Sequence, residues 1–134
     1  MTGRFRLKFF VVAASLLSLS SDFTNARSPP SMADVGDAIR GFVKLDAMTA
    51  WCTGQREATF RNNMLAIIAI SASDEKQQNY FIGYYDRQYT GALGWQERFI
   101  DTEEKRSKYC SVENFAQVKK GLEKLARKVN YPGF

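Results

Sequence analysis

Four acidic residues lie close together in the second half of the chain: Glu97, Asp101, Glu103 and Glu104. Two facing carboxyl groups can act as general acid and as base or nucleophile in glycoside hydrolysis. Nothing in the sequence brings two of these four into one pocket, and the alternating charges up to Lys108 are typical of an exposed helix face. A small secreted hydrolase is therefore an alternative interpretation, while the prediction is a protein that is not an enzyme.

The amino-acid composition excludes several other kinds of active site. The 134-residue chain contains no His and two Cys. Without His, a Ser-His-Asp or Cys-His catalytic site and a His-ligated metal site are excluded. Two thiolates are too few for a four-thiolate zinc site or an iron–sulfur cluster. The sequence therefore predicts no catalytic residue, no metal ligand and no cofactor-binding residue.

Residues 1–26 have the pattern of a secretory signal peptide. Three cations at positions 4, 6 and 8 precede a mainly apolar stretch over 9–19, and Thr24-Asn25-Ala26 resembles a cleavage site. The apolar stretch covers roughly half the thickness of a bilayer, so an uncleaved anchor is the less favoured alternative. We expect cleavage after Ala26, which leaves residues 27–134 as one α-helical domain in the periplasm or outside the cell.

The expected mature chain is only weakly basic. It has 16 basic and 13 acidic residues, a net charge of +3. A nucleic-acid-binding protein usually has a stronger and more clustered positive charge. It also has no second apolar run of the length that a spanning helix needs. The sequence therefore predicts no nucleic-acid partner, and no membrane association after the signal peptide is removed.

Cys52 and Cys110 are the only thiols. In an exported protein an even number of Cys indicates pairing, and the wide spacing does not fit a Cys-x-x-Cys redox motif. We therefore predict a structural disulfide between them. The loop that it closes has about 59 residues, which corresponds to roughly 4 kcal/mol on the loop-entropy model.

The spacing of apolar residues predicts an all-α fold, a small bundle of four to five helices. A first helix is expected from Ser31 to about Cys52, with a break at Gly41 as an option. The later helices are expected at 57–71, from 74 to just before Gly91, around 95–100 and over 111–129, with a loop at 90–94. The continuous apolar run 64–70 is expected to be the most buried element, with a β-strand over 65–70 as the competing interpretation.

Aromatic residues are concentrated between positions 80 and 99. On a helix, those from Tyr80 to Tyr89 would spread over an arc of about 180°, wider than a stripe that faces only a core. Tyr and Trp combine large rigid contact area with a polar tip, which suits them to interfaces. The alternative is that all of them belong to the core and its rim. The candidate partner-binding residues are Tyr80, Tyr84, Tyr85, Tyr89 and Trp95.

The segment from Lys105 to Lys128 is rich in cations, with eight basic and two acidic residues. It could bind an acidic protein, anionic lipid or nucleic acid. The favoured interpretation is a solvated helix face, with cations placed well near a helix C-terminus.

Three short features resemble the Rap/Tai-type immunity proteins of type VI secretion. They are Trp51-Cys52 at the end of a helix, Phe81-Ile82-Gly83-Tyr84, and Cys110 before a last amphipathic helix through Gln117, Val118 and Leu122. The chain departs from that family at Phe81, where a further Cys is common, and at 111–113, which lacks a usual Pro. The family consists of small periplasmic helical proteins that bind and neutralise a toxic cell-wall amidase.

The resemblance therefore implies an exported binding protein, an immunity-type inhibitor whose partner is a toxin or effector. Size, helical content and one disulfide are also similar to those of periplasmic acid-stress chaperones. A chaperone-like protein is therefore a further alternative to the immunity interpretation, beside the secreted hydrolase.

The signal-peptide prediction can be tested on protein isolated from its own cells. We expect mass spectrometry to show a chain that begins at Arg27 with its two Cys joined. An intact Met1, or two free thiols in material prepared with a thiol-blocking reagent, would contradict the predicted export.

Overall fold

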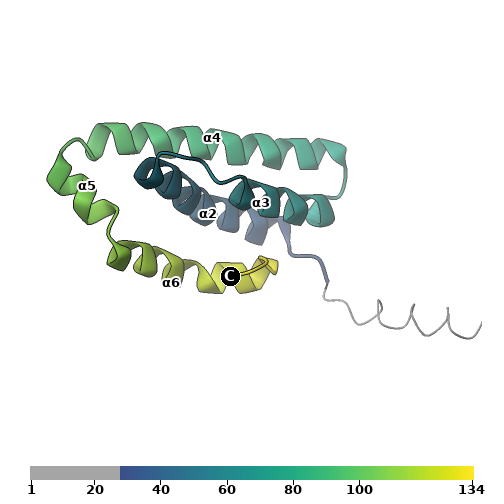
Figure 1. Ribbon diagram of the computed structural model, residues 1–134. Helices are drawn as coiled ribbons and strands as arrows, with labels where there is room; N and C mark the ends of the chain where they lie inside the picture. The colour runs from purple at the N-terminus through teal and green to yellow at the C-terminus, as the bar shows by residue number, and fades with distance from the viewer. Residues whose placement is uncertain (1–27) are drawn as a thin grey trace, which may run out of the picture.

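The computed structural model describes residues 28–134, and the predicted signal peptide lies outside these residues. This part of the chain contains five helices and no strand, so the predicted all-α bundle is confirmed and the strand over 65–70 is not formed. The helices are α2 (Met32–Thr53), α3 (Ala58–Ser71), α4 (Glu75–Phe99), α5 (Glu103–Tyr109) and α6 (Val112–Val129) (Figure 1).

Short polar side chains define where most of the helices begin. The N-cap residues of α2, α4, α5 and α6 each accept a hydrogen bond from a backbone N–H three residues ahead: Ser31, Asp74, Thr102 and Ser111. Such a bond satisfies one of the free amides of the first turn. Helix α2 ends at Gly54, which has a positive φ of 78° that glycine adopts without strain.

Helix α2 is the centre of the bundle. It packs against α4, α6 and α3, and its side chains Val35, Ile39 and Phe42 are fully buried. The expectation that 64–70 would be the most buried element is wrong, because α3 packs with one face only. Met64, Ile67 and Ile68 are buried on that face, while Ile70 points to solvent.

Helix α4 runs without interruption through the predicted loop at 90–94, so that prediction is wrong. Gly91 and Gly94 each weaken a helix by about 1 kcal/mol relative to Ala. The packing of α4 along α2 outweighs this effect, since Tyr85 and Gln96 are buried on both sides of the two glycines and Ala92 packs against the core.

Gly41 does not interrupt α2 either, and its role is close packing. A Cβ atom at this position would lie 2.5 Å from Leu122 Cδ2 and 3.1 Å from Leu125 Cδ1. Both leucines belong to α6, so the missing side chain lets α6 approach α2 closely. The apolar stripe predicted for the last helix is the face that makes this contact, with Leu122, Ala126 and Val129 buried.

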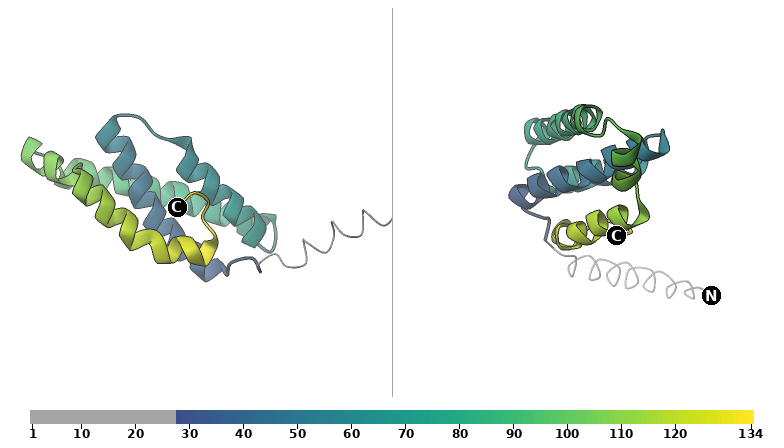
Figure 2. Two further views of the ribbon diagram at one scale, coloured as in Figure 1. Left: turned by 60° about the horizontal axis from the view of Figure 1, so that its bottom comes forward. Right: turned by 90° about the vertical axis from the view of Figure 1, so that its left-hand side faces the viewer.

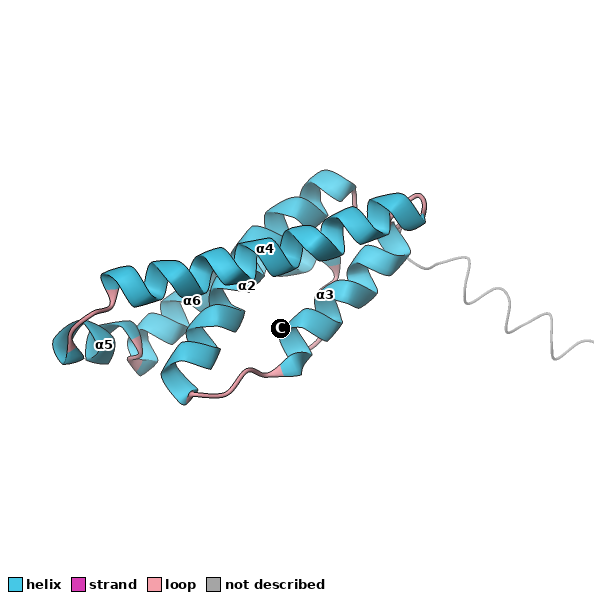
Figure 3. Cartoon of the chain, turned by 90° about the horizontal axis from the view of Figure 1, so that it is seen from above, coloured by secondary structure: helices cyan, strands magenta, loops and turns pink. Residues whose placement is uncertain are grey.

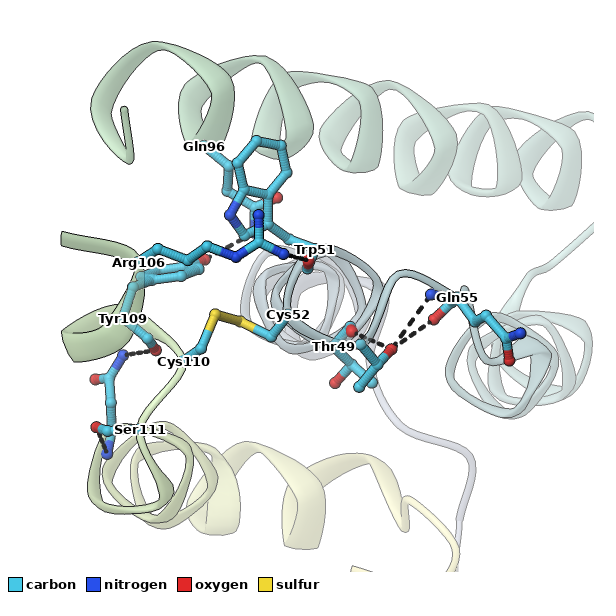
Figure 4. The surroundings of a disulfide bond; sticks show 11 residues. Thr49, Trp51, Cys52, Gln55, Gln96, Arg106, Tyr109, Cys110 and Ser111 are labelled. Carbon is cyan, nitrogen blue, oxygen red and sulfur yellow. Dashed lines mark hydrogen bonds between the residues drawn. A yellow bond between two sulfur atoms is a disulfide. The ribbon is translucent and has the colours of Figure 1, made fainter. Parts of the chain in front are cut away.

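The predicted disulfide is confirmed. Cys52 and Cys110 are bonded, with their Cα atoms 5.5 Å apart. The bond joins the last turn of α2 to the short turn between α5 and α6 (Figure 4). Arg106 of α5 reinforces the same connection, because its guanidinium donates to the Trp51 carbonyl oxygen over 3.2 Å.

Helices α4 and α6 lie on opposite sides of α2 and are connected at one end by α5 (Figure 2). Seen from above, α4 runs lengthwise over the bundle, with α3 beside it (Figure 3). The extensive contacts of both α4 and α6 are with α2. The outer edges of α4 and α6 therefore stand apart, and α2 forms the floor between them.

Removal of the disulfide tests how much the bundle depends on this connection. We expect the double variant Cys52→Ala with Cys110→Ala to lose about 4 kcal/mol of free energy of unfolding, because its unfolded chain is no longer constrained. Urea unfolding followed by circular dichroism measures the loss. Wild-type protein unfolded under reducing conditions serves as the control and should match the variant. If the variant unfolded at the same midpoint urea concentration as the disulfide-bonded wild type, the prediction would be contradicted.

Candidate functional site

An open groove lies between α4 and α6, with α2 as its floor. Its volume is about 900 Å³. The floor includes Val43, Met48 and Gly41, and the walls carry Ala92 from α4 and Val118 from α6. Because the two walls are helices held apart by α2, the groove is a consequence of the bundle architecture. It has the size and partly apolar lining of a ligand-binding cleft.

The charged residues that line the groove all carry positive charge. They are Arg40 and Lys44 on the floor and Arg87 on the α4 wall, and among the described lining residues there is no Asp or Glu. Arg40 is neutralised in part by Asp37, with which it forms an ion pair. Lys44 and Arg87 make no ion pair within residues 28–134. The groove therefore offers a positive potential to a ligand.

A polar cluster closes the groove at the α5 end. Gln96 Nε2 donates to the Tyr109 hydroxyl over 2.7 Å (Figure 4). Asn114 Nδ2 donates to the Tyr109 carbonyl oxygen over 2.7 Å. Burial raises the pKa of Tyr109, so its hydroxyl stays protonated. Gln96 is 1% exposed, and its Oε1 has no hydrogen-bond partner among the described residues. The Gln96 oxygen is buried, so the Tyr109 hydroxyl, which lines the groove, is the group of this cluster that can donate to a ligand.

A second, smaller hollow of about 360 Å³ lies beside the groove, at the start of α2. Its lining includes Gly36, Phe81 and Tyr84, and it shares Arg40 with the groove. Arg40 Nη1 donates to the Tyr84 hydroxyl over 3.0 Å and so connects α2 to α4 between the two hollows. Both hollows therefore open along the same side of α4.

Four aromatic side chains follow this side of α4: Tyr80, Tyr84, Trp95 and Phe99, which we call the aromatic edge. Their spacings of 4, 11 and 4 residues place them on one helix face. Tyr80 is 60% exposed and Trp95 50%, while Tyr84 is half-buried. Trp95 has ring contacts with Phe99 at 5.6 Å and with Tyr109 at 6.1 Å between centroids.

Tyr85 is not a surface residue, and its prediction as a partner-binding residue is wrong. It is 0% exposed, because it lies on the face of α4 that packs against α2. Tyr89 is half-buried and lies under Arg56, whose Cζ is 3.6 Å from the ring centroid. Of the five predicted residues, Tyr80 and Trp95 are the two that present large exposed surfaces.

The sequence analysis missed a buried polar network around Asp46. Asp46 Oδ2 accepts a hydrogen bond from the Tyr85 hydroxyl at 2.7 Å and one from Arg56 Nη2 at 3.1 Å. Burial, followed by the bond to Asp46, raises the pKa of Tyr85 above its ordinary value. The signal for this network was present in the sequence: Asp46 follows Phe42 by four residues and therefore lies on the apolar stripe of α2.

The structure does not bring the candidate carboxylates into a pocket. Glu97, Asp101, Glu103 and Glu104 are all exposed, and none of them lines the two hollows described above. Asp101 pairs with Lys105 over 2.8 Å, which lowers the pKa of Asp101, and Glu104 lies 3.4 Å from Lys108. Among residues 28–134, no group of three or more His, Cys, Asp or Glu side chains could hold a metal ion.

The basic residues of the C-terminal region form an exposed face of α6. They are Lys119, Lys120, Lys124, Arg127 and Lys128. Lys128 lies 4.0 Å from Asp34 of α2. Lys124 follows Gln117, a lining residue of the groove, by seven residues and therefore lies on the same side of α6. Part of the basic face thus borders the groove.

Comparisons with known proteins found no match for this chain. No protein-family model matches the chain, and no curated protein or solved structure matches it significantly. Within residues 28–134, none of the helices combines the length and apolar character needed to cross a bilayer.

The role of the Asp46 network can be separated from ring packing by two matched variants. We expect Tyr85→Phe to lower the free energy of unfolding by about 1–3 kcal/mol, because a buried carboxylate loses its hydroxyl donor. Tyr89→Phe retains the ring beneath Arg56 and should change stability by less than about 0.5 kcal/mol. Urea unfolding of both variants provides the comparison. Equal stabilities for the two variants would show that the Tyr85 hydroxyl does not stabilise the fold.

Proposed function

We propose that this protein is exported to the periplasm and binds another protein through the aromatic edge and the adjoining groove. The observation that supports this most directly is the exposure of Tyr80, Trp95 and Phe99 along one side of α4. Buried aromatic anchors at the centre of a contact contribute much of the binding energy in protein complexes. A partner that covers this edge would bury them.

The position of Trp95 supports the same proposal. Its ring is in contact with Phe99 and Tyr109, so its orientation is fixed by neighbours from α4 and α5 before a partner arrives. A side chain that is already ordered loses less conformational entropy on binding. Next to it the groove provides a concave surface, into which a projecting segment of a partner would fit.

Two features support export. The first 26 residues have the pattern of a signal peptide, and the Cys52–Cys110 disulfide is the kind of bond that persists in oxidising compartments. Structural disulfides are rare in the reducing cytosol. The periplasm is the compartment that the resemblance to immunity proteins also implies.

An immunity-type inhibitor is the specific form of binding protein that we propose. The resemblance to Rap/Tai-type proteins suggests a toxic cell-wall amidase as the partner class. Inhibition by binding requires a rigid surface and no catalytic group of the inhibitor's own. The bundle supplies such a surface, because α2 and the disulfide fix the positions of α4, α5 and α6.

The proposal predicts a specific loss of capture. Tagged protein expressed with its signal peptide should recover a partner from envelope extract, identified by mass spectrometry. We expect the double variant Tyr80→Ala with Trp95→Ala to lose that partner, because the two largest exposed anchors are removed. Ile70→Ala, which truncates an equally exposed side chain on α3, is the matched control and should retain it.

Thermal unfolding of the variants checks that both remain folded. Recovery of the same proteins by wild type and by the Tyr80/Trp95 variant would contradict binding through the aromatic edge. If a recovered partner is an amidase, its hydrolysis of peptidoglycan should be inhibited by wild-type protein and restored with the double variant.

A further inference from the structure

We propose that the groove between α4 and α6 binds an acidic peptide segment of the partner protein, with its backbone lying close to Gly91 and Gly121. This inference rests on the proposed function, since it names the chemistry of the segment that the binding surface would accept. Four observations support it: the charge of the lining, the charge of the rims, the two glycines and the polar cluster at the α5 end.

The lining selects for negative charge. Lys44 lies exposed on the floor and Arg87 on the α4 wall, and within the described residues neither has an acidic partner. Arg87 lies near the Tyr80 ring, with its Cζ 5.9 Å from the centroid, which leaves its N–H groups available. Carboxylates bound to Lys or Arg make charge-assisted hydrogen bonds, which are stronger than neutral ones.

The two rims continue this positive charge. On α6, Lys120 and Lys124 follow Gln117 by three and seven residues, so they stand along the outer edge of that wall. On α4, Arg98 follows Trp95 by three residues and lies on the corresponding edge. One acid, Glu113, stands on the same edge of α6, four residues before Gln117. A ligand in the groove would therefore meet mainly cations, on the floor and on both sides. This arrangement favours a segment with several Asp or Glu residues.

The two glycines leave space for a peptide backbone. Gly91 lines the α4 wall and Gly121 lines the α6 wall, and a Cβ built on either would have no atom within 4 Å. Neither glycine is therefore required for packing inside the bundle, in contrast to Gly41. Glycine in a helix interior is destabilising, and one reason to retain it is the close approach of another chain.

The polar cluster supplies a hydroxyl that a peptide backbone can use. A peptide unit brings one N–H donor and one C=O acceptor. The Tyr109 hydroxyl lines the groove, accepts from Gln96 and has its own proton to donate to a peptide carbonyl. The wall from Arg87 to Gln96 is about 14 Å long at helical rise, enough for about four residues of extended chain.

The test uses a fluorescein-labelled octapeptide of alternating Glu and Gly, and the same peptide with Lys in place of Glu. Disulfide-bonded protein comprising residues 27–134 is titrated into each, and fluorescence anisotropy reports binding. We expect the Glu peptide to bind with an affinity that falls as salt is raised, and the Lys peptide not to bind. No binding of the Glu peptide at low salt would overturn the inference.

Two matched glycine variants locate the binding site. Gly121→Leu fills the groove from the α6 wall, and we expect it to weaken binding of the Glu peptide by about tenfold or more. Gly94→Leu is the control, because Gly94 is also exposed with open space around it but does not line the groove. Leu is a better helix former than Gly, so both variants should unfold at or above the wild-type temperature.

A third variant, Lys44→Glu, places a like charge on the floor and should also reduce affinity for the Glu peptide by about tenfold. Equal affinities for Gly121→Leu and Gly94→Leu would show that the peptide binds elsewhere on the basic surface, and would overturn the groove as the site. If the Glu peptide does not bind, or binds both glycine variants equally, loss of partner capture by the Tyr80/Trp95 variant would still support the proposed function.

Discussion

The burial of α2 governs the rest of this structure. One helix of 22 residues packs against three others, and its apolar side chains, from Val35 to Met48, make up a large part of the core. Since α4 and α6 both need the surface of α2 to cover their own apolar faces, they take positions on opposite sides of it. The groove is the space that remains between α4 and α6 over the surface of α2. It is open because α3 packs against a different part of α2.

The far end of the bundle depends on a covalent constraint. Helix α5 is short and has no buried residue, so its own packing contributes little to holding it in place. The Cys52–Cys110 bond fixes the turn that follows it, and Arg106 and Tyr109 attach it to α2 and α4 through hydrogen bonds. The polar end of the groove and the ring contacts of Trp95 both rely on this attachment.

The proposed binding surface combines two kinds of recognition. The aromatic edge offers large exposed aromatic area along the rim of the groove, which Trp95 also lines, while the lining and rims offer positive charge. Apolar contact contributes affinity, whereas charge complementarity contributes specificity and speeds association. A partner that presents an acidic segment beside an apolar patch would contact both the groove and the aromatic edge.

Local sequence patterns were sufficient for much of the fold. The starts of the first and last helices near Ser31 and Ser111, the amphipathic character of α6 and the pairing of the two Cys all depend on neighbouring residues or on a count, and each is confirmed. The continuity of α4 through Gly91 and the burial of Tyr85 against Asp46 depend on residues distant in sequence, as does the lack of a partner for the Gln96 oxygen among residues 28–134. Tertiary packing alone decided them, because whether a side chain faces core, groove or solvent depends on which helices flank its own.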